Sequence, residues 1–432
     1  MIPWLLAGLI TASAAVSLKR FPAFHPAQLW SIPWALATLA YAMNLLPYRE
    51  IRVSTAALIA MSVIGFVLGT DQARRRGVVL RGPSLGIAVR RGETTQTPLE
   101  AAAVAAFLIA ALWCAAFVIQ VASQFGVANV LSADFVVRKA IGAGDFGPTI
   151  KYTYAALGSA ALTATAAGRA TASRRRTAWL SVSAISVAMI YFATGRATLM
   201  AAAVAALVAY CLAANVEVSR RRLAIGAALT VAMAVAVFIA GSELSGKTFA
   251  NNPELAILPS AFNDNHDLPD WMALPYQYVS APVAAVDVQL SYTNGIGGSW
   301  GCATLPEACS GLQSLGFDVE PIDRIRPFTA HPLPWNTYTS IDAPALDFGW
   351  VLTAPVFFLI GLLSGGLWNR AEGGSSGAIA IYALLAPALI TGFNVFNFTA
   401  PHVIGSMVYA AALMWMATVI SGRNRGNLRS TS

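Results

Sequence analysis

Long apolar runs recur along this chain of 432 residues, and they constrain its fold more than any other feature. Many of them are near 20 residues long, and a helix of about that length crosses the hydrocarbon core of a bilayer. Hydrophobic residues make up 57% of the chain and charged residues only 11%, whereas soluble domains carry about 25% charged residues. The sequence therefore predicts an all-α, polytopic membrane protein.

The apolar runs predict eleven transmembrane helices, with the N-terminus outside and the C-terminus inside. The first run has no basic residue before it but is followed by Lys19 and Arg20, which favours a retained span over a cleaved signal peptide. With this topology most lysines and arginines fall on the cytoplasmic side, as the positive-inside rule requires. The basic clusters are therefore interpreted as topology signals, and no nucleic-acid partner is predicted. The predicted spans are 2–17, 28–46, 53–70, 99–120, 150–167, 178–194, 197–215, 223–241, 346–366, 377–392 and 402–420.

The predicted spans divide the chain into three parts. Residues 1–241 hold the first eight spans with short loops, and residues 346–432 hold the last three spans and a basic cytoplasmic tail. Between them, residues 242–345 form one large outer loop. Apolar residues recur at helical spacing over 279–292 and over 304–315, so we expect this loop to be a mostly helical cap.

The segment 178–215 is too long for one span, because a straight helix of that length would far exceed the bilayer. The sequence Thr194-Gly195-Arg196 is the place where it can fold back, since Gly195 permits a tight turn. This prediction puts Arg196 at the outer face of the membrane.

Two of the four cysteines lie close together in the large loop. Cys302 and Cys309 are seven residues apart, whereas Cys114 and Cys211 each lie inside a predicted span. An outer loop would be in an oxidising compartment, where a disulfide forms and persists. We therefore expect a Cys302–Cys309 disulfide, and the alternative is a pair of free thiols.

Several cations face outward in this topology, against the usual bias, and each needs a reason. They either pair with the outer acids and with lipid phosphates, or they bind a phosphate or pyrophosphate group at the membrane face. Arginine suits the second role because its planar guanidinium bonds phosphate oxygens in pairs. The outward cations considered are Arg138, Lys139, Lys151, Arg196, Arg324 and Arg326.

The large loop also supplies acids and histidines that could act as a general base. His331 stands out because it lies between Arg324/Arg326 and Asn336. Asp347 lies where a span is predicted to begin, and the alternative is an acid favoured by a helix N-terminus. For the others a solvated carboxylate is the simpler interpretation, and no calcium-loop or zinc spacing predicts a metal. The other acids are Asp264, Asp267, Asp270, Asp287, Asp318, Glu320, Asp323 and Asp342, and the loop also contains His266.

Three stretches carry a resemblance to a known family. They are Thr194-Gly195-Arg196, the run from Gly298-Ser299-Trp300-Gly301-Cys302 to Leu305-Pro306, and Asn336-Thr337-Tyr338-Thr339 followed by Asp347-Phe348-Gly349. In this order, from about residue 191 onward, the chain resembles the bacterial oligosaccharide repeat-unit polymerases, the Wzy-type O-antigen and capsule polymerases. The resemblance covers roughly half of the chain, and the N-terminal half is similar to the family only in hydropathy.

The resemblance implies a glycosyl transfer on the periplasmic face of the bacterial inner membrane. A glycan would leave its polyprenyl-pyrophosphate carrier and join the non-reducing-end hydroxyl of a second lipid-linked repeat unit, without a cofactor or metal. The implied partners are the polyprenyl-pyrophosphate-linked oligosaccharide, membrane lipids and a chain-length regulator. One alternative is an O-antigen ligase, whose acceptor is lipid A–core. Another is a flippase or transporter, for which small outer loops and paired repeats are typical.

On this hypothesis each candidate residue has an expected role. Arg196, together with one or more of Arg324, Arg326 and Arg138, would bind the pyrophosphate. His331 or Asp347 would act as the base or orient the acceptor. Asn336 and Tyr338 would shape the pocket. The loop aromatics, Tyr278 and Trp300 among them, would either stack on sugar faces or anchor the loop at the membrane interface.

Overall fold

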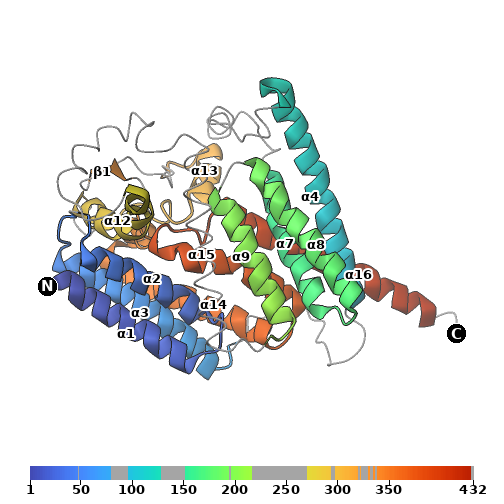
Figure 1. Cartoon of the computed structure of the whole chain (residues 1–432), viewed down its shortest axis with the longest axis horizontal. Helices are drawn as coiled ribbons and strands as arrows, with labels where there is room; N and C mark the ends of the chain where they lie inside the picture. Colours follow the sequence, from blue (N-terminus) through green and yellow to red (C-terminus); the bar gives the residue numbers. More distant parts are fainter. Residues whose placement is uncertain are drawn as a thin grey trace. The chain divides into compact units, whose positions relative to one another are not determined.

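The computed structural model of this chain describes most of the predicted spans and part of the large loop (Figure 1). It shows an almost entirely helical protein, and its only strands in the described residues are the two-residue pair β1 (Thr329–Ala330) and β2 (Pro334–Trp335). The described residues are 1–46, 48–78, 96–127, 151–193, 196–216, 270–292, 297–319, 322, 329–330, 334–335 and 338–429.

Among the described residues, six helices are long and apolar enough to cross a membrane: α1 (Ile2–Arg20), α3 (Val53–Arg75), α4 (Gln96–Phe125), α14 (Asp342–Glu372), α15 (Ser376–Ile390, extended by η3, Thr391–Phe393) and α16 (Pro401–Arg429). Four more predicted spans are also helices, each 17 or 18 residues long. They are α2 (Pro26–Met43), α7 (Tyr152–Arg169), α8 (Ser173–Met189) and α9 (Arg196–Ala213). The predicted span 223–241 lies outside the described residues. The count of eleven spans and their orientation stay predictions.

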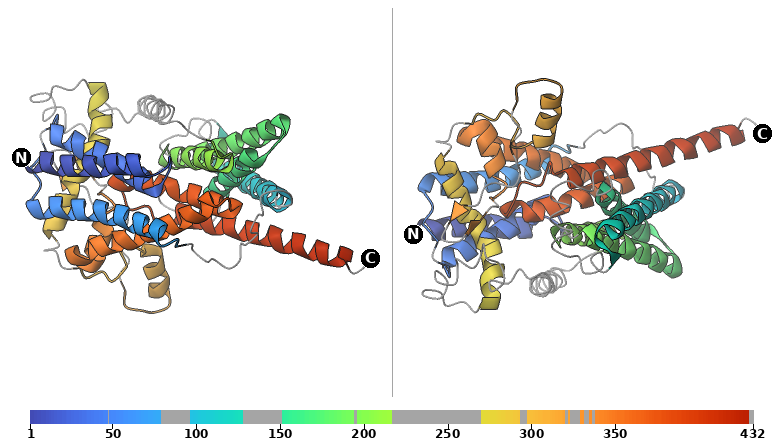
Figure 2. Two further views of the ribbon diagram at one scale, coloured as in Figure 1. Left: turned by 90° about the horizontal axis from the view of Figure 1, so that it is seen from below. Right: turned by 90° about the horizontal axis from the view of Figure 1, so that it is seen from above.

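The chain divides into two units. The first unit comprises Met1–Val78, Ser219–Gly366 and Leu389–Thr399, and the second comprises Val79–Val218, Leu367–Ala388 and Ala400–Ser432. In the first unit, α1, α2 and α3 lie side by side, and α12 (Asp270–Tyr292) lies across them (Figures 1 and 2). The same unit also contains the short helix α13 (Pro306–Ser314), the β1–β2 pair, most of α14, and η3.

An aromatic cluster forms the core of the first unit. Trp30 of α2 is fully buried, with its ring centroid 4.7 Å from that of Phe66 in α3 and 5.3 Å from that of Phe357 in α14. Close by, α3 and α14 approach so tightly that a Cβ on Gly361 would lie 2.2 Å from the carbonyl oxygen of Phe66. Only glycine fits there, because any Cβ would clash with that carbonyl. Small residues at such positions let the backbones of membrane helices pack closely. Gly8 in α1 is different, since a Cβ there meets nothing within 4 Å.

The connection between α1 and α2 is held by polar contacts. The side chain of His25 caps α2 by accepting a hydrogen bond from the Ala27 backbone N–H at 3.2 Å, and its ring stacks on Phe21. His25 is fully buried. Burial, together with the nearby positive charge of Arg74, lowers the pKa of the His25 imidazole from 6.5 to about 3. A neutral imidazole is therefore part of this connection.

In the second unit, α7 is buried along nearly its whole length. Its small residues allow α4, α8, α9 and α16 to pack around it. The predicted division of the segment 178–215 is confirmed, because α8 ends at Met189, a 3₁₀ turn η2 covers Ile190–Ala193, and α9 begins at Arg196. The hydroxyl of Tyr152 donates to the Met189 carbonyl at 3.1 Å and ties the end of α8 to α7.

Candidate functional site

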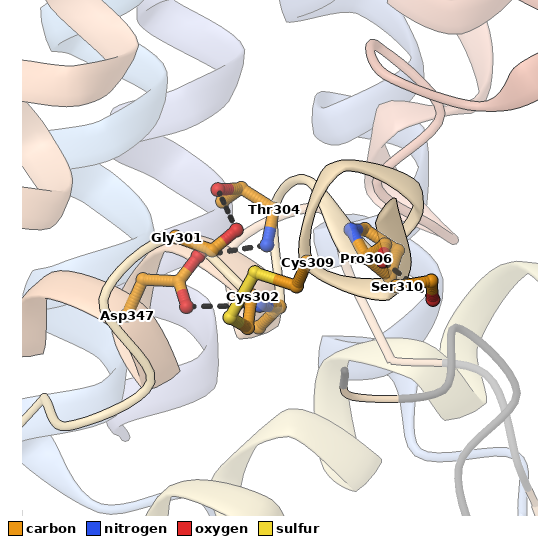
Figure 3. The surroundings of a disulfide bond; sticks show 8 residues. Gly301, Cys302, Thr304, Pro306, Cys309, Ser310 and Asp347 are labelled. Atoms are coloured by element: carbon orange, nitrogen blue, oxygen red, sulfur yellow. Dashed lines mark hydrogen bonds between the residues drawn. A yellow bond between two sulfur atoms is a disulfide. The ribbon is translucent and has the colours of Figure 1, made fainter. Parts of the chain in front are cut away.

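The carboxylate of Asp347 holds a loop of the large outer segment. Its Oδ1 accepts a hydrogen bond from the Ala303 N–H at 2.9 Å, and its Oδ2 accepts one from the Thr304 N–H at 2.7 Å (Figure 3). Asp347 is 3% exposed, and both amide groups belong to buried residues. Hydrogen bonds to a charged group are stronger than neutral ones, so this carboxylate fixes the loop against α14.

A break in α14 lies beside this contact. Gly349 has φ of 72° and ψ of 178°, which interrupts the helix between Asp342 and Glu372. The loop fits against this break through Gly297, because a Cβ on Gly297 would lie 2.3 Å from the Gly349 nitrogen. The carbonyl of Leu346 accepts a hydrogen bond from the Gly298 N–H at 3.0 Å. The backbone of the loop therefore packs directly against the break in α14.

The predicted disulfide closes the same loop. Cys302 and Cys309 are joined (Figure 3), which confirms the prediction. Cys114 and Cys211 are free thiols. The Thr399 hydroxyl donates to the Thr304 carbonyl, so the segment that follows η3 also holds the loop. We call residues 297–305, with Asp347 and Gly349, the seam between the large segment and α14.

A second polar cluster joins α12 to the start of α3. Oδ1 of the buried Asp287 accepts hydrogen bonds from the Arg52 N–H at 3.2 Å, from the Arg52 Nε at 3.0 Å and from the Thr55 hydroxyl. Nη2 of Arg52 donates to the Asp287 carbonyl at 2.6 Å. The guanidinium carbon lies 5.9 Å from the centroid of the Trp350 ring, one residue after the break in α14. The Arg52 side chain is 39% exposed, so its guanidinium can still meet an anion.

Tyrosine hydroxyls fasten α12 to the connection between α2 and α3. The Tyr276 hydroxyl donates to the Ala40 carbonyl and accepts from the Leu45 N–H at 3.0 Å. The Tyr48 hydroxyl shares a 2.9 Å hydrogen bond with Ser280, and burial raises the pKa of Tyr48 above its ordinary value, although this hydrogen bond acts in the opposite direction. The Tyr276 hydroxyl is therefore committed to this contact.

The structure accounts for some of the residues that the sequence singled out. Asp347 belongs to the seam, Tyr338 is buried, and Tyr278 is exposed on α12. The backbone of Arg196 begins α9 in the second unit, and its side chain is not described. The other predicted site residues lie outside the described residues, so their roles stay predictions: His331, Arg324, Arg326, Arg138 and Asn336.

Two details differ from the sequence-based expectation. The helix α14 starts at Asp342 and breaks at Gly349, so Asp347 lies directly before its second segment, but its carboxylate accepts from the amides of a distant loop instead of those of its own helix. Arg52 was not singled out. It is one of the outer cations in the predicted topology and directly precedes the span predicted at 53–70, which is the signal that could have identified it.

The described residues contain no group of three or more histidines, cysteines, aspartates or glutamates that could hold a metal ion. Three comparisons with known proteins found no match for this chain among family models, curated sequences or solved structures. Inferences about function therefore rest on the residues and contacts described above.

Proposed function

We propose that the protein is a membrane glycan polymerase of the bacterial inner membrane, acting on lipid-linked repeat units at the periplasmic face. One observation carries this proposal. Two of the three stretches that resemble the repeat-unit polymerases meet at the seam, where Asp347 of one stretch accepts hydrogen bonds from Ala303 and Thr304 of the other. These residues are more than 40 positions apart, so the resemblance has a counterpart in space.

The proposed reaction is a single glycosyl transfer. The acceptor hydroxyl oxygen forms a bond to the anomeric carbon of the donor glycan while the bond from that carbon to the pyrophosphate oxygen breaks. The hydroxyl proton passes to a base, and polyprenyl pyrophosphate leaves with the bonding electron pair. Such a step needs a positioned base and cationic help for the leaving group.

The proposed roles follow from the chemistry and from the contacts. Arg196, with Arg324, Arg326 and Arg138, supplies guanidinium groups for the pyrophosphate, and His331 is the proposed base. Asp347 is reassigned to positioning, because each of its two oxygens already accepts a hydrogen bond from a buried amide. Asn336, Tyr338 and Tyr278 remain proposed pocket residues.

Arg52 is an additional candidate for binding the leaving group. It is partly exposed, it lies at the start of an apolar helix, and it is held in place by Asp287. The ion pair offsets much of its charge, so we assign it a hydrogen-bonding role for one phosphate oxygen rather than a purely electrostatic role. An immobilised guanidinium loses less conformational entropy when it binds such an oxygen.

A deletion phenotype tests the proposal against the nearest alternative. In a host that displays this polysaccharide, loss of a polymerase leaves one repeat unit on the lipid A–core, whereas loss of a ligase leaves none. Complementation with Arg196→Ala should fail to restore long chains, and complementation with Arg75→Ala, an exposed charge whose buried partner Asp71 also pairs with Arg20, should restore them. Wild-type chain lengths from Arg196→Ala at equal protein level would refute the role of Arg196.

A further inference from the structure

The disulfide-closed part of the large segment exposes an unusual number of apolar side chains. Trp300 is 86% exposed and Leu315 is 76% exposed, and Leu305, Leu312 and Phe317 are exposed as well. All five lie within residues 300–317, outside the long apolar helices. An exposed apolar cluster of this kind marks a surface that contacts something other than water.

The charges of this segment indicate how it could contact a bilayer. Residues 297–319 contain Glu307 and Asp318 but no lysine or arginine. Attraction to anionic lipid headgroups, which basic surface helices use, is therefore absent from this segment. Any attachment to a bilayer would depend on burying apolar surface alone.

The helix α13 lies at the side of the first unit, next to α14 (Figure 2). Both views in Figure 2 show α13 standing out beside α14, on the side away from the far end of α12. The helix α14 itself exposes Val351, Leu352, Leu359 and Leu363, the apolar surface that a span presents to lipid. Within this unit the two exposed apolar surfaces thus belong to neighbouring elements.

The loop is also held rigidly enough to keep a fixed depth. The seam ties it to α14 through the two hydrogen bonds of Asp347, and the Cys302–Cys309 disulfide closes the turn that leads into α13. Trp300 has a φ of 45°, which is rare for a bulky residue, and this backbone conformation directs the chain into the turn before Gly301. Trp300 therefore combines a rare backbone conformation with a highly exposed side chain.

We propose that residues 300–317 form an interfacial anchor, with α13 lying in the bilayer interface and its apolar residues in contact with acyl chains. Tryptophan is favoured at this depth, which accounts for its exposure here. Of the two roles that the sequence left open for Trp300, this assigns it to anchoring rather than to sugar stacking. The inference does not depend on the proposed polymerase function.

Spin labels on the full-length protein test this proposal. One variant carries the label through Leu312→Cys and a second carries it through Ser310→Cys. Both variants also carry Cys114→Ala and Cys211→Ala, which remove the two free thiols. The two positions lie on roughly opposite faces of α13, since successive residues of a helix are about 100° apart. The protein is placed in lipid nanodiscs of phosphatidylcholine, with and without phosphatidylglycerol, and relaxation by oxygen and by a water-soluble nickel complex is measured.

The expected result is a label at 312 that oxygen relaxes more strongly than nickel does, and a label at 310 with the opposite preference. The difference should be the same in both lipid mixtures, because no basic residue is involved. Equal nickel access at both positions would overturn the proposal. So would spin–spin coupling between two copies, or a label at 312 that neither reagent reaches, since each shows that protein covers the surface. If Leu312→Cys does not fold, a label at Trp300→Cys gives the same comparison.

Discussion

Replacing Asp347 with asparagine separates a positioning role from a catalytic one. The asparagine side chain keeps one acceptor oxygen, so one of the two amides at Ala303 and Thr304 loses its partner and stays buried. A hydrogen bond to a charged group contributes about 2 kcal/mol, and we expect the local opening of the loop to become about 30-fold more frequent. Asp347→Ala removes both bonds and should raise opening by about 1,000-fold, or about 4 kcal/mol.

Amide hydrogen exchange measures this opening directly. In detergent-solubilised protein, peptides that cover residues 298–305 should exchange faster in Asp347→Asn than in the wild type, and faster again in Asp347→Ala. Asp318→Asn is the matched control, because Asp318 is an exposed acid of the same segment and its replacement should leave the exchange unchanged.

Unchanged exchange at 298–305 in both variants would show that Asp347 does not hold the loop. If polymer synthesis were nevertheless lost, Asp347 would have to act on the substrate itself. A loss of synthesis that follows the increase in exchange would instead support a carboxylate that positions the seam.

Three further perturbations follow from the packing and from the charges. Gly361→Ala should lower the unfolding temperature, at a cost of about 1–3 kcal/mol from overpacking, whereas Gly8→Ala should not, because its Cβ enters open space; thermal unfolding in detergent compares them. His25→Asn keeps a capping acceptor but cannot titrate in this range. Because the pKa of His25 is depressed in the folded state, the free energy of unfolding of the wild type should fall by up to about 2 kcal/mol as the pH falls from 6.5 to about 5. The free energy of unfolding of the variant should not change in this way. In a double-mutant cycle, Arg52→Ala and Asp287→Ala should show a coupling of about 1 kcal/mol or more, and additive effects would contradict the ion pair.

Local patterns were sufficient to predict much of this fold. Apolar runs near 20 residues have few alternatives to a helix in a bilayer, so each predicted span outside 223–241 coincides with a helix. The fold-back before Arg196 followed from length and from one glycine, and the disulfide followed from the spacing of Cys302 and Cys309. Each of these features depends on residues that are close in sequence.

The contacts that build the seam depend on residues far apart, and no periodicity pairs them. Nothing in the local sequence links Asp347 with the amide of Ala303, or Asp287 with Arg52. The first pair forms only when the 297–305 loop packs on α14, and the second only when α12 packs on α3. The helix α12 begins at Asp270, earlier than its apolar pattern predicts, although Pro275 lies inside it. Its packing on α2 and α3 offsets the helix-breaking tendency of that proline.

Purified protein in detergent, mixed with polyprenyl-pyrophosphate-linked repeat units and no nucleotide sugar, shows most directly whether this protein polymerises repeat units. A polymerase should give a ladder of lipid-linked products, each longer by one repeat unit, together with released polyprenyl pyrophosphate. Gel separation after labelling the glycan resolves the ladder. Lipid-linked units that remain single, or that are transferred only when lipid A–core is supplied, would rule out a polymerase.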